Sequence, residues 1–136
     1  MADLPWPKVG PVDQASPTIL VIDDDDIVRD SVRVLLETRN FTVTDFASAD
    51  AFLRHEDGLA ADCIVLDLHM PGMTGLELLK RLRTLGDQTP VILVTGRPDA
   101  TTQAEARALG VPLLEKPISA QLLFATIGGV LGHRPR

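Results

Sequence analysis

The sequence predicts an α/β fold with a single-domain five-stranded parallel sheet, (βα)5 and doubly wound, with helices on both faces. Continuous apolar runs at Thr18–Ile22, Cys63–Leu66 and Val91–Val94 are typical of strands buried on both faces. Strand and helix patterns alternate five times along the chain, as parallel strands with right-handed crossovers require. The 136 residues, 45% hydrophobic and 24% charged, are enough for one good core.

The remaining elements follow from shorter patterns. Asp25 or Asp26 is suited to cap the helix that follows the first strand, and Ser48 to cap a short helix. The patterns predict helices over about 27–39, 75–85, 100–109 and from about 119, with strands over 41–46 and 111–114 near sheet edges.

Two of these helices carry weaker signals. The helix over 100–109 is poor in large apolar residues, so we expect it to be held weakly, with Ala104, Ala108 and Leu109 buried. Leu122 is expected on the buried side of the last helix. Gly128 and Gly129 each cost about 1 kcal/mol in a helix interior, so fraying is expected there.

The flanks and the charge limit the function. Residues 1–17 hold four prolines and are expected to be a leader or linker, 18–131 the domain, and 132–136 a C-terminal tail. A net charge of -6 argues against direct nucleic-acid binding, because phosphate backbones need clustered cations. No signal peptide or 18-residue apolar run is found, so we expect a cytoplasmic protein without a membrane anchor.

Polar residues stand where the predicted strands end. Asp67 directly follows the apolar run Cys63–Leu66, and Pro71 and Gly72 stop the strand shortly after it. Carboxyl ends of parallel strands meet at one rim, where ligands of open α/β sheets bind. The residues that this geometry brings together are Asp23, Asp24, Asp67, Thr95 and Lys116.

This set has a definite chemistry. Clustered carboxylates repel one another, and a divalent cation relieves that repulsion. Oxygen ligands favour Mg²⁺, whereas zinc is disfavoured because no His/Cys set has ligand spacing. Thr95 and Lys116 add a hydroxyl and a positive charge that suit phosphoryl oxygens, so Asp67 is a candidate nucleophile for an aspartyl phosphate.

Each residue also has an ordinary structural explanation. Asp67 could cap a turn, the acidic run could be a solvated helix cap, and Lys116 could be a surface lysine. His69 could pass for a ligand or base, but no residue in the sequence pairs with it. The joint placement at strand ends favours the functional interpretation.

The motifs resemble the receiver domain of bacterial two-component response regulators, the CheY-like family. The resemblance covers about residues 18–131 and rests on four stretches of sequence. They are Ile22-Asp23-Asp24, Leu66-Asp67-Leu68-His69-Met70-Pro71-Gly72-Met73-Thr74-Gly75, Thr95-Gly96 and Lys116-Pro117.

The resemblance implies a flavodoxin-like strand order, 2-1-3-4-5, and a role for each site residue. Asp67 would take a phosphoryl group from a phosphohistidine of a sensor histidine kinase or histidine phosphotransfer protein. Mg²⁺ would be bound by Asp24, Asp67 and the backbone carbonyl of His69, with Asp23 acting largely through water. Thr95 and Lys116 would contact the phosphoryl group, and Lys116-Pro117 resembles the family's cis peptide, which sequence alone cannot distinguish from trans.

One departure from the family bears on signalling. Receivers often carry Tyr or Phe three positions before the lysine, and its inward rotation reports phosphorylation on the face of the fourth helix, fifth strand and fifth helix. Leu113 occupies that position here. We expect the chemistry to survive, while the readout through this face, and a homodimer formed by it, stay open.

Three functions compete. The first is a phosphoacceptor domain, not an enzyme in its own right, either free-standing or excised from a larger regulator or hybrid kinase. The second is a haloacid-dehalogenase-like phosphatase, a class that uses a second Asp two residues after the nucleophile as general acid. His69 occupies that position here. The third is a degenerate docking receiver, whose acidic pair, Thr and Lys would be eroded; all are present here.

Overall fold

A computed structural model describes residues 16–55 and 60–132. The expected leader therefore lies outside the described residues apart from its last two positions, as does the tail apart from Gly132. The elements in chain order are β1 (Thr18–Ile22), α1 (Asp26–Glu37), β2 (Thr42–Phe46), α2 (Ala49–Arg54), β3 (Cys63–Asp67), α3 (Gly75–Thr84), β4 (Val91–Thr95), α4 (Ala100–Ala108), β5 (Leu113–Glu115) and α5 (Ala120–Gly132).

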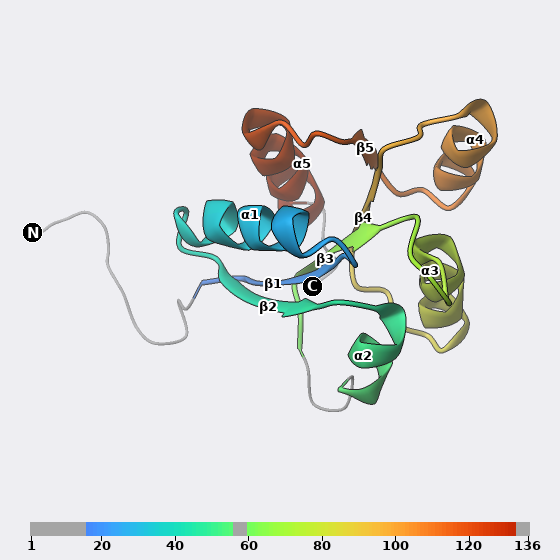
Figure 1. Cartoon of the computed structure of the whole chain (residues 1–136), viewed down its shortest axis with the longest axis horizontal. Helices are drawn as coiled ribbons and strands as arrows, with labels where there is room; N and C mark the ends of the chain where they lie inside the picture. The colour runs from blue at the N-terminus through green and yellow to red at the C-terminus, as the bar shows by residue number, and fades with distance from the viewer. Residues whose placement is uncertain (1–15, 56–59, 133–136) are drawn as a thin grey trace, which may run out of the picture.

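The five strands form one parallel sheet in the order β2-β1-β3-β4-β5 (Figure 1). This confirms the predicted fold class and strand order. The edge positions predicted for the second and fifth strands are also confirmed. The three continuous apolar runs are the three central strands, because only strands covered on both faces need apolar residues at every position.

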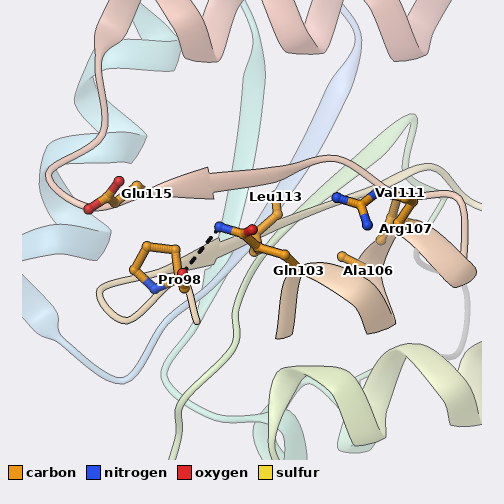
Figure 2. A pocket seen from close by; sticks show the side chains of 7 residues that line it. All are labelled: Pro98, Gln103, Ala106, Arg107, Val111, Leu113 and Glu115. Atoms are coloured by element: carbon orange, nitrogen blue, oxygen red, sulfur yellow. Dashed lines mark hydrogen bonds between the residues drawn. The ribbon is translucent and has the colours of Figure 1, made fainter. Parts of the chain in front are cut away.

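The α4–β5 edge departs most from the predictions. Ala106 is the buried residue of α4, whereas Ala104 and Ala108 are exposed, so the predicted burial of those two was wrong. The buried side of the helix carries Ala106, with Thr102, Glu105 and Leu109 partly buried beside it. This side of the helix differs from the one predicted to carry Ala104 and Ala108. Pro112 precedes the short strand β5, and an open cavity separates β5 from α4 (Figure 2).

The last helix also differs from expectation. Leu123 and Ile127 are its buried residues, while Leu122 is 50% exposed. The helix continues through Gly128 and Gly129 to Gly132, so the structure shows no break at the glycine pair.

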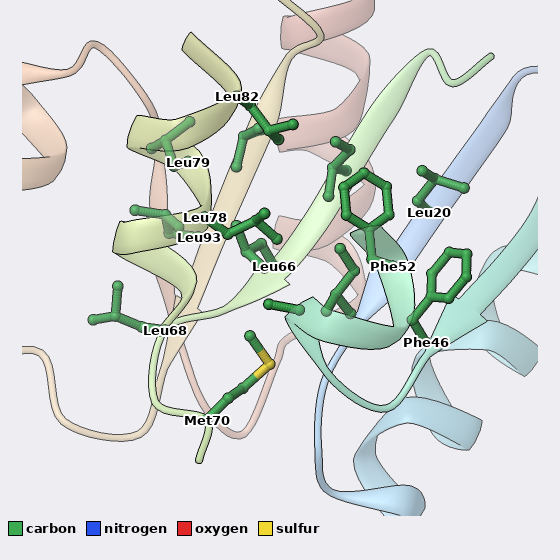
Figure 3. Packing of buried hydrophobic residues seen from close by; sticks show 14 of the residues in the cluster. Leu20, Phe46, Phe52, Leu66, Leu68, Met70, Leu78, Leu79, Leu82 and Leu93 are labelled. Atoms are coloured by element: carbon green, nitrogen blue, oxygen red, sulfur yellow. The ribbon is translucent and has the colours of Figure 1, made fainter. Parts of the chain in front are cut away.

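The core has two layers because side chains alternate along each strand. On one face, α1 and α5 cover Ile19, Val21, Cys63 and Val65. On the other face, α2, α3 and α4 cover a leucine-rich cluster shown in Figure 3. There Phe46 meets Phe52 edge to face, with ring centroids 5.6 Å apart. The two layers fix the strands, and therefore the positions at which their carboxyl ends stop.

Candidate functional site

Strand register brings the site residues to one rim of the sheet. Ile22 pairs with Leu66 across β1 and β3, so Asp23 emerges beside Asp67. Asp67 pairs with Val94, which places Thr95 one residue further along β4. The Lys116 backbone N–H donates to the Thr95 carbonyl oxygen at 2.8 Å, which brings the start of the β5–α5 connection to the same rim.

Three carboxylates meet at this rim. Asp23, Asp24 and Asp67 each offer an oxygen, and the three oxygens lie within 4.8 Å of one another. Asp23 and Asp67 are only 4% and 3% exposed, while Asp24 faces solvent. Two buried acids and one exposed acid therefore cluster at this rim, where Asp24 and Asp67 line a pocket that opens to solvent.

Lys116 neutralises the two buried acids. Its Nζ lies 3.1 Å from Oδ2 of Asp23 and 3.2 Å from Oδ1 of Asp67. Burial lowers the pKa of Lys116, but the hydrogen bonds and charges of the two aspartates outweigh that effect and raise it overall. The ammonium is therefore charged at neutral pH.

Asp67 stays difficult to ionise in spite of Lys116. Burial, together with the charge of Asp23, raises the pKa of Asp67 from 3.8 to about 7, although Lys116 opposes the shift. One lysine thus offsets the repulsion only in part. Oxygen donors, partial burial and uncompensated negative charge fit a hard divalent cation, whose charge would stabilise ionised Asp67.

The β3–α3 loop folds back onto Asp67. The Gly75 N–H donates to the Leu68 carbonyl oxygen at 2.9 Å, and a Cβ on Gly75 would overlap the Asp67 backbone carbonyl. Thr74 caps α3 through a capping box with Glu77, which fixes where the loop ends. His69 lies in this loop and lines the same pocket as Asp24, Asp67 and Lys116.

Thr95 takes a different place from the other predicted residues. Its side chain is fully buried, and its Oγ1 accepts a hydrogen bond from the Arg97 backbone N–H at 2.9 Å. The adjoining Gly96 and Arg97 line the pocket wall, whereas the buried Thr95 does not. A rotation of the hydroxyl toward the pocket would have to give up this hydrogen bond.

The Lys116–Pro117 peptide bond is cis, as the resemblance implied. Leu113, at the position where the family often carries an aromatic ring, is half-buried and packs against the α2–α3–α4 side of the core. It also lines the cavity between α4 and β5 with Pro98, Gln103 and Glu115 (Figure 2).

Sequence reasoning missed two residues of the pocket wall. Asp25, read only as a helix cap, does cap α1, and it also lines the pocket. Arg97 lies two residues beyond the end of β4 and was not singled out. Its position just after a strand end, on the rim where the other site residues gather, is the signal that could have identified it.

Comparison with known proteins agrees with this geometry. The family model described as the response regulator receiver domain matches residues 19–128. The transcriptional regulatory protein FixJ of Bradyrhizobium diazoefficiens is 44% identical over 110 residues, which are 80% of this chain and 54% of that protein. The response regulator protein TodT of Pseudomonas putida is 33% identical over 125 residues, covering 91% of this chain and 55% of that protein.

Solved structures give the same result. The crystal structure described as FixJ-N has a TM-score of 0.80 and 32% identity, covering 89% of this chain and 98% of that one. The chemotaxis protein CheY4 of Vibrio cholerae has a TM-score of 0.78 and 27% identity, covering 85% of this chain and 99% of that one.

The fold and the site define a phosphoacceptor module of two-component signalling, and the chain belongs to the response regulator receiver domain family. Domains of this family interact with histidine kinases. The chain spans about half the length of the curated relatives it matches. Every helix within residues 16–55 and 60–132 is too short or too polar to cross a bilayer.

Proposed function

We propose that Asp67 is the phosphoryl acceptor of this receiver domain and that Asp23, Asp24 and the His69 backbone carbonyl help it to hold Mg²⁺. The observation that carries the proposal is the cluster itself. Three carboxylate oxygens lie within 4.8 Å of one another, and Lys116 contacts both buried aspartates. An aspartate used only as a turn cap has no need of such partners.

The phosphoryl transfer to Asp67 involves no oxidation or reduction, so it needs no redox cofactor. An Asp67 carboxylate oxygen attacks the phosphorus of a phosphohistidine and forms a new P–O bond. The P–N bond breaks, its electron pair stays on the imidazole nitrogen, and that nitrogen takes up a proton. Bound Mg²⁺ would supply positive charge to the phosphoryl oxygens and keep Asp67 ionised.

The chain's own groups position the phosphoryl group. Lys116 lies within reach of Asp67 and offers a compact positive charge to the transferred oxygens. Thr95 would contact the phosphoryl group after its hydroxyl leaves the Arg97 N–H. The chain thus takes part in its own phosphorylation and dephosphorylation while the phosphodonor is another protein.

We extend this proposal to the phosphodonor, the cellular compartment and the surface that carries the signal. The donor is a sensor histidine kinase or a histidine phosphotransfer protein, and the site of action is the cytoplasm. The surface of α4, β5 and α5 carries the signal onward and is the candidate homodimer face. The net negative charge of the chain supports the proposal that this domain does not itself bind nucleic acid.

Phosphorylation by acetyl phosphate with Mg²⁺ tests the proposal. The native chain is expected to gain the mass of one phosphoryl group, and Asp67→Asn to gain none. Asp50→Asn removes an exposed carboxylate on α2 and serves as the control. Phosphate recovered on a histidine or lysine, or full labelling of Asp67→Asn, would overturn the assignment.

A further inference from the structure

The pocket wall carries a cation that no group in the described part of the chain engages. Arg97 lines the pocket together with Asp24, Asp67 and Lys116. Its side chain is exposed, and within residues 16–55 and 60–132 its guanidinium takes part in no ion pair or hydrogen bond. Arg29 and Arg33, in contrast, are both held by acidic side chains.

The backbone of Arg97 is fixed although its side chain is free. Its N–H donates to Oγ1 of Thr95 at 2.9 Å, and its carbonyl oxygen accepts from the Asp99 N–H at 2.8 Å. These two bonds hold the residue in the turn between β4 and α4. The guanidinium is thus tethered to the rim of the pocket and is still available to a ligand.

The charges on the pocket create a need for such a cation. Asp24, Asp25 and Asp67 line it, so an incoming phosphoryl group meets negative charge. Lys116 is already engaged by Asp23 and Asp67 before any donor arrives. Arg97 is the lining residue with a full positive charge that is not already neutralised by an acid.

We propose that Arg97 is a phosphodonor-binding residue, whose guanidinium binds the phosphoryl oxygens of the donor and brings the phosphorus to Asp67. A planar guanidinium matches a phosphoryl group with paired hydrogen bonds, which a lysine ammonium cannot do. This inference rests on the proposed role of Asp67. It adds a residue that selects the phosphoryl group common to acyl phosphates and phosphoramidates.

A donor-binding role for Arg97 predicts which kinetic parameter its removal changes. With acetyl phosphate, the Asp67 oxygen forms the new P–O bond, the old P–O bond breaks, and acetate leaves with the electron pair. Arg97 is not part of this exchange. Its loss should therefore raise the half-saturating donor concentration and leave the maximal rate nearly unchanged.

The test is the initial rate of Asp67 phosphorylation over a series of acetyl phosphate concentrations at saturating Mg²⁺. Arg97→Ala is expected to raise the half-saturating concentration about threefold to tenfold, because an exposed charge-assisted contact has that strength. Arg97→Lys should recover part of the loss. Arg81→Ala, which removes an exposed arginine from α3, controls for net charge and should match the native chain.

A second donor distinguishes what Arg97 binds. The same shift with phosphoramidate supports binding of the shared phosphoryl group, whereas a shift with acetyl phosphate alone would overturn it by pointing to the acyl group. Unchanged half-saturation in Arg97→Ala, or a loss in maximal rate alone, would also overturn the inference. Those outcomes leave the proposed function standing so long as the native chain is labelled and Asp67→Asn is not.

Discussion

Asp67 is held where its own charge is disfavoured. Burial and Asp23 raise its pKa to about 7, and Lys116 only partly opposes them. The native state therefore binds the Asp67 proton more tightly than the unfolded chain does. The stabilising effect of that proton is complete below pH 4 and is lost as the pH rises through 7. A carboxylate poised in this way is suited to react with a cation or a phosphoryl group.

Asp67→Asn should consequently be more stable than the native chain at pH 8 in the absence of Mg²⁺. The expected gain in the free energy of unfolding is about 1–4 kcal/mol, and it should shrink to near zero at pH 4. Urea unfolding in EDTA at both pH values measures it. Asp50→Asn is the matched control, and a gain of equal size at pH 4 and pH 8 would contradict the electrostatic explanation.

The acids, the hydroxyl and the lysine could be found from sequence because each lies at a strand end or just after one. Thr95 shows the limit of that reasoning, since a strand end fixes the backbone but not where the hydroxyl points. Arg97 was missed because its place just after the end of β4 marks the rim of the sheet but no particular chemistry. Its meaning comes only from Asp24, Asp67 and Lys116, which are remote in the chain.

The β3–α3 connection is the element whose exact path the site depends on. A Cβ at Gly75 would meet the backbone carbonyl of Asp67, a neighbour that cannot rotate away as a side chain could. The first turn of α3 and the end of β3 therefore approach more closely than any residue but glycine allows.

Gly75→Ala is expected to lower the free energy of unfolding by about 1–3 kcal/mol and to slow Asp67 phosphorylation, because the clash moves the Asp67 backbone. Gly128→Ala is the control, since the same added methyl meets open space on α5. It should raise stability by about 0.5–1 kcal/mol, the usual gain for alanine in a helix. Thermal unfolding and the acetyl phosphate assay measure both variants.

The helix α4 is held less firmly than its neighbours. Ala106 is its only buried residue in the described structure, whereas α3 buries three leucines. An exposed ion pair between Lys80 and Glu105, at 3.8 Å, adds little. We expect amide protons of α4 to exchange faster than those of α3, measured by hydrogen exchange at one pH. Equal protection of the two helices would show that α4 has support beyond these contacts.

Elements with large apolar residues were predictable, and those without them were not. Runs such as Val91–Val94 gave strands within one residue of the observed bounds. In α4, several alanines at different spacings could each face the core, and only the packing of the sheet selects Ala106. Near β5, the sequence predicted a strand over 111–114, but the strand begins at Leu113, because Pro112 cannot donate a hydrogen bond to the sheet.

At the scale of the molecule, the acidic site works against the stability of the fold that carries it. The sheet is covered on both faces, and its layers fix the strand ends, so the buried carboxylates of Asp23 and Asp67 cannot move apart without disturbing the core. The chain as a whole is also negative, with a net charge of -6. A bound dication should therefore stabilise the entire domain rather than only the loops around it.

Adding Mg²⁺ to about 100 times its Kd is expected to raise the free energy of unfolding by about 2.7 kcal/mol, because the native state binds the ion and the unfolded chain does not. Thermal unfolding with and without EDTA measures the shift, and NaCl at matched ionic strength separates binding from screening. Replacing both Asp23 and Asp24 with Asn should abolish the Mg²⁺ effect while raising stability in EDTA. A full Mg²⁺ effect in that double variant would place the cation elsewhere on the molecule.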